Sequence, residues 1–371
     1  RGRLGPGEMI AVDTQTGKLW KNNAIDDSLK ANHAYREWMT ENVIRVWNND
    51  EQERKAANKF MRESADRLPA FQRMFGLGAE EIETIIKPMA LNSQEPVGSM
   101  GDDTPLAVLS EHNRSIYDYF RQSFAQVTNP PIDPLRESAV MSLETCIGRE
   151  HNVFNETASH AFRVLLPWPV LNYVKYQTLL KLDQRYYRKV RFSLNFDPDF
   201  TGLKAALENL AESCLQSVKE GATVIVLSDR DITTGHLPMP APLAVGAVHQ
   251  ALLKAGDRAN ANIIIETGSA RDPHQFAVLL GLGATAIYPY LAFQSINQQQ
   301  QLGALEGEPI ELARRLAREH GLTCVVTLGA SGAVAVGPDG GWRVGSLSIE
   351  PVDTTGAGDA FVGVLAAELD D

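Results

Sequence analysis

The spacing of apolar residues changes near residue 189 and divides the chain into two regions. Before that point polar helical patterns predominate, and the clearest are "HAYREWMTENVIRVW" and "AEEIETIIKPM". After it, "VRFSLNF" alternates as a half-buried strand does, while "ATVIVLSDR" and "ANIIIETG" are the continuous apolar runs typical of parallel strands. Helical segments separate these runs. The pattern therefore predicts an α/β fold in which a helical N-terminal segment precedes a doubly wound, mostly parallel central sheet.

Individual residues predict where several elements begin and end. In "GLKAALENLAESCLQSVKEG" the apolar residues share one helical face, and Gly221 follows at the position of a C-terminal cap. Asp272 precedes Pro273, the combination favoured at an N-cap and the first helical position. Nearer the N-terminus, "EMIAVDTQTGKLWK" has two apolar runs around a Thr-Gly turn, and this predicts a β-hairpin.

Two further segments concern helices and their ends. The stretch "LAVLSEHNRSIYDYFRQSFAQV", residues 106–127, predicts a helix, and the loop "TNPPIDP" ends it because consecutive prolines cannot continue a helix. The stretch "QSINQQQQLGALEGEP", residues 294–309, has no apolar face. It is interpreted as a linker or as the end of a surface helix.

Composition restricts the classes of partner and of site. The chain has 35 basic and 46 acidic residues and a net charge of −11, so neither nucleic acid nor an anionic membrane is expected as its partner. No apolar run reaches about 18 residues, so no membrane span is expected. Cys146, Cys214 and Cys324 form no CxxC pair, and they predict no metal site but reduced thiols in a cytoplasmic protein. Cys214 lies on an apolar helical face and is expected to be buried.

Three groups of polar residues leave both a structural and a functional interpretation open. Asp102 and Asp103 in "GSMGDDTP" could bind a metal, although turn stabilisation is the preferred interpretation. His274 starts a helix beyond a strand's carboxyl end, where α/β proteins often bind ligands, although a surface or capping role is preferred. Asp229 and Arg230, in "LSDR", follow a strand and could form an internal ion pair or contact a ligand.

Residues 1 to about 302 resemble the large subunit of bacterial glutamate synthase. The resemblance is carried, in this order, by "GRLGPGEMIAVDTQTG", "GSMGDDTPLAVLS", "YDYFRQSFAQVTNPPIDPLRESAVMSL", "LSDR" and "ANIIIETGSARDPHQFAVLLGLGATAIYPYLAF". It implies the end of a glutamine amidotransferase domain over residues 1–50 and the family's central domain over residues 51–302. In that family an N-terminal cysteine hydrolyses glutamine, and ammonia crosses a tunnel to 2-oxoglutarate. FMN, beside an iron–sulfur cluster, then reduces the imine.

The resemblance implies a connector between two active sites. The chain begins after the amidotransferase nucleophile and stops matching before the FMN barrel and the cluster cysteines. No cofactor is therefore expected on this chain, which alone should be inactive, and its expected partners are the missing amidotransferase and FMN domains. The resemblance places the loop residues Thr128, Asn129 and Pro130 near the ammonia tunnel. The alternative is that this loop is only a rigid turn that ends a helix.

Residues from about 307 to 371 resemble the C-terminal part of the ribokinase-like carbohydrate kinases. "CVVTLGASGAVAV" followed by "VDTTGAGDAF" carries this resemblance. Gly356, Ala357 and Gly358 open a helix, where backbone N–H groups and the helix dipole favour phosphate, and small residues let the backbone approach it. By resemblance, Asp359 matches the catalytic base that takes the proton from the sugar hydroxyl.

The same resemblance assigns two further groups of residues. Asp353 and Thr355 match positions that bind a monovalent cation in several family members, and Gly329 and Gly332 match a turn near the nucleotide. The family's sugar-binding strands and lid lie upstream of this region, where this chain has glutamate synthase-like sequence. A partial kinase fragment over residues 311–371, joined through a linker at 303–310, is therefore expected to be an anion-binding remnant.

The leading hypothesis is a glutamate synthase connector with an appended kinase fragment. Such a chimera is explained more simply by an artefact of assembly or cloning than by a natural fusion. The first alternative is a carbohydrate kinase that uses ATP, Mg²⁺ and Asp359 to phosphorylate a sugar hydroxyl. The second is a non-catalytic scaffold whose helical N-terminal segment exposes apolar surface.

Overall fold

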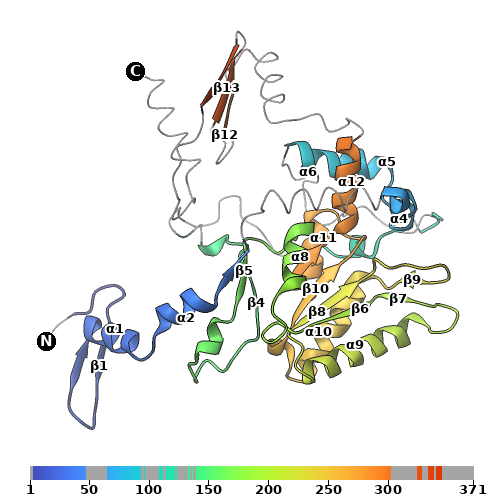
Figure 1. The fold of residues 1–371 in the computed structure, drawn as a ribbon. Helices are drawn as coiled ribbons and strands as arrows, with labels where there is room; N and C mark the ends of the chain where they lie inside the picture. The colour runs from blue at the N-terminus through green and yellow to red at the C-terminus, as the bar shows by residue number, and fades with distance from the viewer. Residues whose placement is uncertain are drawn as a thin grey trace. The chain divides into compact units, whose positions relative to one another are not determined.

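The computed structural model describes residues 3–46, 65–92, 96, 108–111, 114–121, 123, 133, 136, 139–301, 324–327, 333–337 and 340–344. The chain divides into two compact units. The first comprises Arg1–Pro88 with Glu95–Ser295, and the second comprises Met89–Gln94 with Ile296–Asp371. Figure 1 shows their helices and strands, coloured along the chain.

A four-stranded parallel sheet organises the first unit. Its strands lie in the order β11-β10-β8-β6, with bounds Ala286–Tyr288, Asn262–Glu266, Val224–Ser228 and Lys189–Ser193. Every residue of β8 and β10 is buried, which confirms the interpretation of their continuous apolar sequences. Beyond β11, Val170 forms a parallel bridge with Ile287.

Helices cover both faces of this sheet (Figure 1). The connecting helices α9 (Leu203–Lys219), α10 (Ala241–Lys254) and α11 (Pro273–Gly281) share one hydrophobic core with the residues that the strands direct toward them. On the opposite face lies α8 (Tyr173–Lys181), where the Tyr176 ring stacks on Tyr288 with 4.6 Å between ring centroids. The mixed α/β class with a parallel sheet is confirmed. The doubly wound arrangement is not, because the described strands follow one another across the sheet in sequence order.

The expected ends and faces of these helices are confirmed. The Asp272 carboxylate accepts a hydrogen bond from the Gln275 backbone N–H at 2.8 Å, and Pro273 is the first residue of α11. Gly221 follows α9 with φ +98°, a conformation that favours glycine. The Cys214 side chain is fully buried in the core.

The N-terminal residues form the expected hairpin followed by short helices. Strand β1 (Ile10–Val12) pairs antiparallel with β2 (Leu19–Lys21), and Gly17 has φ +71° in the turn between them. Helices α1 (Asn22–Ala31) and α2 (Tyr35–Asn42) follow. A small sheet of order β3-β5-β4 then joins distant segments; its strands are Ile44–Arg45, Val164–Leu166 and Thr145–Ile147.

A second group of helical segments lies between residues 65 and 92. A 3-10 turn, η1 (Ala65–Arg67), leads into α4 (Leu68–Met74). The sequence "AEEIETIIKPM" is helical as expected, but it is divided into α5 (Ala79–Glu81), the π-helical turn η2 (Ile82–Ile86) and α6 (Lys87–Asn92). Pro88 accounts for this irregularity because it has no N–H to donate to the preceding turn. The remaining short elements are η4 (Ala158–Ala161), β7 (Asn195–Phe196), β9 (Leu237–Pro238) and η5 (Arg258–Asn260).

Three sequence interpretations are changed or narrowed by the structure. The helix expected in "HAYREWMTENVIRVW" ends at Asn42, because Ile44–Arg45 pair with β5 as strand β3. The helix expected over residues 106–127 is wrong in the part that is described, where only the 3-10 turn η3 (Ile116–Tyr119) forms. Tyr117 accounts for this because its side chain is buried and its hydroxyl lies 3.0 Å from the Ser269 Oγ, a contact far along the chain. Helix α12 (Tyr290–Gln301) includes the start of the Gln-rich stretch, which confirms the helical alternative up to residue 301, although Gln294 and Ser295 are buried and not on the surface.

The second unit contains an antiparallel sheet of order β12-β13-β14, with strands Cys324–Thr327, Ala333–Gly337 and Gly340–Val344. Strand β12 pairs antiparallel with β13, and β13 and β14 form a hairpin. Several predicted positions lie outside the described residues, namely Asp102, Asp103, Thr128, Asn129, Pro130, Gly329, Gly332, Asp353, Thr355, Gly356, Ala357, Gly358, Asp359 and the junction at 302–310. Among the helices that the structure describes, none has the length and apolar character needed to span a membrane.

Candidate functional site at the carboxyl ends of the strands

The polar residues of the first unit gather where the parallel strands end. Strand β8 continues into Asp229 and Arg230, and β10 ends at Glu266 and continues into Thr267 and Gly268. Since β8 and β10 pair in register from Asn262 to Glu266, these residues meet at one edge of the sheet. This edge is where open α/β sheets bind their ligands.

Glu266 is the centre of a buried network at this edge. Its side chain is only 3 % exposed, and both carboxylate oxygens are used. Four side chains donate hydrogen bonds to it: Ser228 at 2.7 Å, Arg230 at 2.9 Å, Tyr176 at 3.0 Å and Arg191 at 3.1 Å. A buried carboxylate needs such compensation for its lost hydration. The network therefore holds β6, β8, β10 and α8 together and leaves Glu266 little capacity for a ligand.

Asp229 binds the loop that follows the neighbouring strand. It is 1 % exposed, and its carboxylate accepts hydrogen bonds from the Thr267 hydroxyl at 2.5 Å and the Gly268 N–H at 3.0 Å. Burial raises the pKa of Asp229 to about 7, although these hydrogen bonds oppose the rise. Of the two possibilities left open for "LSDR", internal pairing is observed, but Arg230 pairs with Glu266 and Asp229 with the loop.

The Phe75 ring fills the space directly over this loop. A Cβ added to Gly268 would lie 2.7 Å from the Phe75 ring and 3.0 Å from the Tyr290 hydroxyl oxygen, so only glycine fits between them. Arg271 donates to the Phe75 carbonyl at 3.3 Å. The Gly268 N–H could otherwise bind an anion, but it donates to Asp229, and the Phe75 ring covers Gly268.

Helix α4 is held against the sheet edge by further polar contacts. The Gln72 amide donates to the Ser295 hydroxyl at 3.0 Å, and the Arg67 guanidinium donates to the Ile232 carbonyl at 3.1 Å. His274 plays a comparable part for η3, because its Nε2 lies 3.1 Å from the Tyr117 carbonyl oxygen. This agrees with the preferred structural interpretation of that histidine.

Candidate metal ligands do not gather in the part of the chain that the structure describes. Within the described ranges, no three His, Cys, Asp or Glu side chains come together as a metal site would require. Cys214 is buried in the core while Cys146 is exposed. The Gly268 N–H, the donor best placed for a phosphate, is bound by Asp229.

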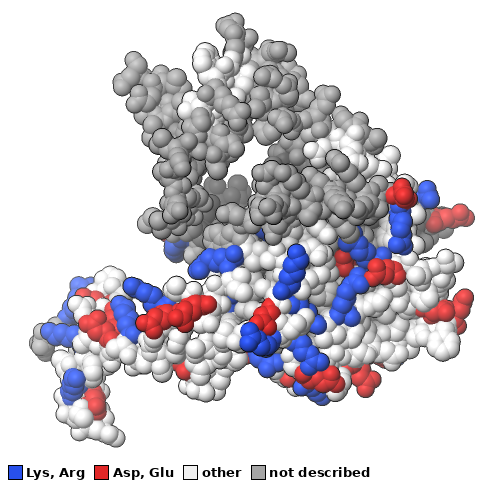
Figure 2. Space-filling view, in the orientation of Figure 1, with Lys and Arg blue, Asp and Glu red and all other residues white. Residues whose placement is uncertain are grey.

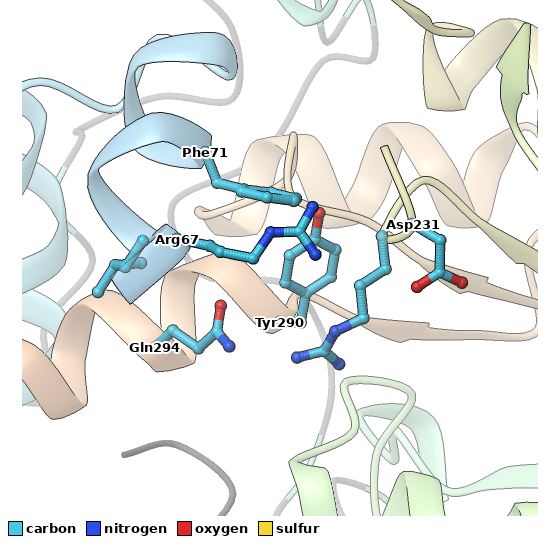
Figure 3. A pocket seen from close by; sticks show the side chains of 7 residues that line it. Arg67, Phe71, Asp231, Tyr290 and Gln294 are labelled. Atoms are coloured by element: carbon cyan, nitrogen blue, oxygen red, sulfur yellow. The ribbon is translucent and has the colours of Figure 1, made fainter. Parts of the chain in front are cut away.

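One small cavity remains at this edge, with a volume of about 90 Å³. It is lined by Arg67, Leu68, Phe71, Arg230, Asp231, Tyr290 and Gln294. Figure 3 shows Arg67, the last residue of η1, and Phe71 of α4 extending toward Tyr290 and Gln294 of α12. On the face seen in Figure 2, basic and acidic side chains are interspersed among the described residues and gather into no extended patch of one sign.

Sequence reasoning identified Asp229, Arg230 and His274 but missed Glu266 and the covering helix α4. A signal for Glu266 was present, because it is the single charged residue ending the apolar run "ANIIIE". The position of α4 had no local signal, since Phe75 and Gly268 are far apart in the sequence.

Comparison with known proteins gives matches over most of the chain. The family model of the glutamate synthase central domain matches residues 70–332, and that of class-II glutamine amidotransferases matches residues 1–38. A ferredoxin-dependent glutamate synthase 2 from Synechocystis is 41% identical over 302 residues, which are 80% of this chain and 19% of the relative. The large chain of an NADPH glutamate synthase from Azospirillum brasilense is 36% identical over 313 residues, 84% of this chain and 20% of the relative. The chain spans about a fifth of the length of the curated relatives it matches.

Proposed function

Because the chain belongs to the glutamate synthase central domain family, we propose that it acts as the connector of a glutamate synthase large subunit. In this role it holds the glutamine-hydrolysing and glutamate-forming domains in register and catalyses neither half-reaction. Glutamate formation from glutamine-derived ammonia and 2-oxoglutarate is then an activity of the whole enzyme.

The observation that carries this proposal is the closed carboxyl edge of the sheet. At the place where an α/β protein would bind a substrate, Asp229 takes the Gly268 N–H and Phe75 covers the loop. The Glu266 carboxylate receives hydrogen bonds at both oxygens. An edge saturated by the protein's own groups supports a role in positioning other domains rather than in chemistry.

The first 38 residues support an attachment to the amidotransferase domain. They match the class-II amidotransferase family model, and their hairpin exposes the apolar side chains of Ile10, Val12 and Leu19 by about half. Such side chains are normally covered by another surface. We assign that surface to the rest of the amidotransferase domain, within the 1–50 segment defined from the sequence.

The cofactors of the reaction are assigned to other parts of the enzyme. On the resemblance, FMN and the iron–sulfur cluster would be held by the domain that follows the central domain. Thr128, Asn129 and Pro130 remain proposed to lie near the ammonia tunnel, on the resemblance alone. A cytoplasmic location likewise remains a proposal.

The connector role is tested by exchanging the region in a whole enzyme. Residues 1–302 of this chain would replace the corresponding region of the Synechocystis relative, and glutamine consumption and 2-oxoglutarate consumption would be measured together. Gly268→Ala is expected to increase the glutamine hydrolysed per 2-oxoglutarate converted, because it displaces Phe75 and α4. Gly281→Ala, at a glycine with no atom near its added Cβ, should leave that ratio unchanged.

The ratio of glutamine hydrolysed to 2-oxoglutarate converted distinguishes a positioning role of this region from a catalytic one. If Gly268→Ala lowered both rates in the same proportion and left their ratio unchanged, the connector proposal would be wrong. An unchanged circular dichroism spectrum would show that the variant is folded. The 371-residue chain alone should convert neither glutamine nor 2-oxoglutarate.

We also propose that residues 311–371 are a partial ribokinase-like fragment joined through residues 303–310. The structure describes the antiparallel strands β12, β13 and β14 within this segment. The family match to residue 332 overlaps the beginning of this segment. The assignments of Asp359 as base, of residues 356–358 to phosphate, of Asp353 and Thr355 to a cation and of Gly329 and Gly332 to the nucleotide rest on the motif.

Kinase activity has a direct test of its own. ADP release from ATP and Mg²⁺ would be measured with a panel of sugars, for the chain and for Asp359→Ala. We expect no sugar-dependent ADP release, because an oriented base without a positioned sugar loses most of its rate enhancement. Sugar-dependent release that Asp359→Ala abolishes would instead favour the kinase function.

A further inference from the structure

Two guanidinium groups, those of Arg67 and Arg230, line the small cavity at the carboxyl edge of the sheet, and their environments differ. Arg230 is already paired, because it donates to the Glu266 carboxylate at 2.9 Å and lies 4.7 Å from the centre of the Tyr290 ring. Arg67 has a carbonyl partner, Ile232, at 3.1 Å. Within the part of the chain that the structure describes, no carboxylate pairs with Arg67.

The Arg67 guanidinium is held by one hydrogen bond and by one aromatic ring. Its central carbon lies 5.0 Å from the centre of the Phe71 ring, and the Ile232 carbonyl binds one terminal nitrogen. Stacking fixes the plane of a guanidinium without using its in-plane N–H groups. In Figure 3 the Arg67 side chain extends from the end of η1 into the space between Phe71, Tyr290 and Asp231.

Asp231 borders the cavity, but its charge is balanced by an arginine that is not among the residues lining the cavity. The Asp231 carboxylate accepts a hydrogen bond from Arg191 at 2.6 Å. The Glu266 carboxylate pairs with both Arg191 and Arg230. Both carboxylates near the cavity, Asp231 and Glu266, are therefore already paired with an arginine other than Arg67. Asp229, also nearby, is bound to the loop and is not among the residues that line the cavity.

The size of the cavity restricts the ligand. Its volume is about 90 Å³, which leaves room for several water molecules. This accommodates a carboxylate group or a small oxyanion but not a nucleotide. The planar edge of a guanidinium matches the two oxygens of a carboxylate, so Arg67 is suited to bind such a group.

We propose that the cavity between α4 and α12 is a binding site for a single carboxylate group, with Arg67 as its main ligand-binding residue. The carboxylate has two sources, a small free carboxylate or an Asp or Glu side chain from another domain of the whole enzyme. The proposal is separate from the connector role, because carboxylate binding at Arg67 does not depend on whether this chain holds the two catalytic domains in register.

Acetate is the probe that tests the site. Saturation-transfer NMR on the methyl signal of acetate would be recorded with the full 371-residue chain at constant ionic strength, and methylammonium would serve as a cation of similar size. We expect saturable acetate binding and none for methylammonium. Arg67→Gln should weaken acetate at least tenfold, because it removes a charge-assisted, two-point interaction.

Arg73→Gln is the matched control. Arg73 lies on α4, the helix that follows Arg67, and it is exposed and outside the lining of the cavity. This variant should bind acetate as the parent does. Arg67→Lys keeps the charge but not the fork, and an intermediate affinity is expected. Absence of binding to the parent chain, or equal weakening by Arg67→Gln and Arg73→Gln, would overturn the proposal.

The source of the carboxylate is resolved in the whole enzyme. The experiment would be repeated on the large subunit that carries residues 1–302 in place of the Synechocystis region. Acetate binding that persists there supports a free carboxylate as the ligand. Binding to the chain but not to the whole subunit supports occupation by a side chain of another domain. Failure of the connector test alone would leave both results unaffected.

Discussion

The Thr267 hydroxyl donates a 2.5 Å hydrogen bond to the Asp229 carboxylate and thereby joins the loops that follow two adjacent parallel strands. The Gly268 N–H donates to the same carboxylate at 3.0 Å. A buried acid therefore occupies the position that an anionic ligand would take at this edge of the sheet. These hydrogen bonds stabilise the fold at this edge, so changes to Asp229 or Gly268 should alter the free energy of unfolding.

The first prediction concerns the pH dependence of stability. Burial raises the pKa of Asp229 from 3.8 to about 7, so between these values the folded state binds more protons than the unfolded state. The contribution of this group is complete below about pH 4 and is lost as the pH rises to 7. Asp229→Asn should remove this loss, which amounts to on the order of 2–4 kcal/mol.

Urea unfolding of the parent and of Asp229→Asn at several pH values between 4 and 8 measures this difference. The free energy of unfolding of the variant should fall less than that of the parent as the pH rises. Two curves that run parallel across this range would contradict the pKa of the buried acid.

The second prediction concerns the contact between Phe75 and Gly268. A methyl group at Gly268 would lie 2.7 Å from the Phe75 ring, so Gly268→Ala should reduce the free energy of unfolding by about 1–3 kcal/mol. Gly281→Ala, at the end of α11 and with open space around its Cβ, should be neutral or stabilise by up to about 1 kcal/mol. Chemical denaturation would compare the two; equal effects would argue against close packing of α4 on the loop.

The third prediction concerns the Glu266 network. Glu266→Ala leaves Arg230 without its carboxylate and Tyr176 without its acceptor, so it should destabilise the first unit by about 3–5 kcal/mol. The control is Glu208→Ala, which removes an exposed ion pair with Lys204 and should cost less than about 1 kcal/mol. Thermal unfolding followed by circular dichroism would distinguish them. A small effect at Glu266 would mean that water compensates its partners.

The fourth prediction concerns thiol reactivity. Cys214 is fully buried, and burial raises the pKa of its thiol to about 12, whereas Cys146 is exposed. A thiol reagent at pH 8 should modify Cys146 in the native chain and Cys214 only after unfolding. Burial also raises the pKa of Cys146, so its reaction should be slower than that of a free thiol. Peptide mass spectrometry would assign each site, and similar rates at both would contradict the burial of Cys214.

The sequence by itself determined the features that depend on neighbouring residues. The hairpin at residues 10–21 follows from apolar runs around a Thr-Gly turn, and the start of α11 follows from Asp272 and Pro273. The buried strands β8 and β10 follow from their continuous apolar residues. These features share one physical cause, since backbone conformation and burial pattern are set within a few residues. The family resemblance over residues 1–302 was likewise visible in the sequence.

Only the tertiary structure decided which distant residues meet at the edge of the sheet. Tyr117 forms a 3-10 turn rather than a longer helix because its side chain is buried beside Ser269. The order of the strands and the covering of Gly268 by Phe75 depend on how separate elements pack together. No local pattern encodes such contacts, because their free energy comes from surfaces that are brought together only when the chain folds.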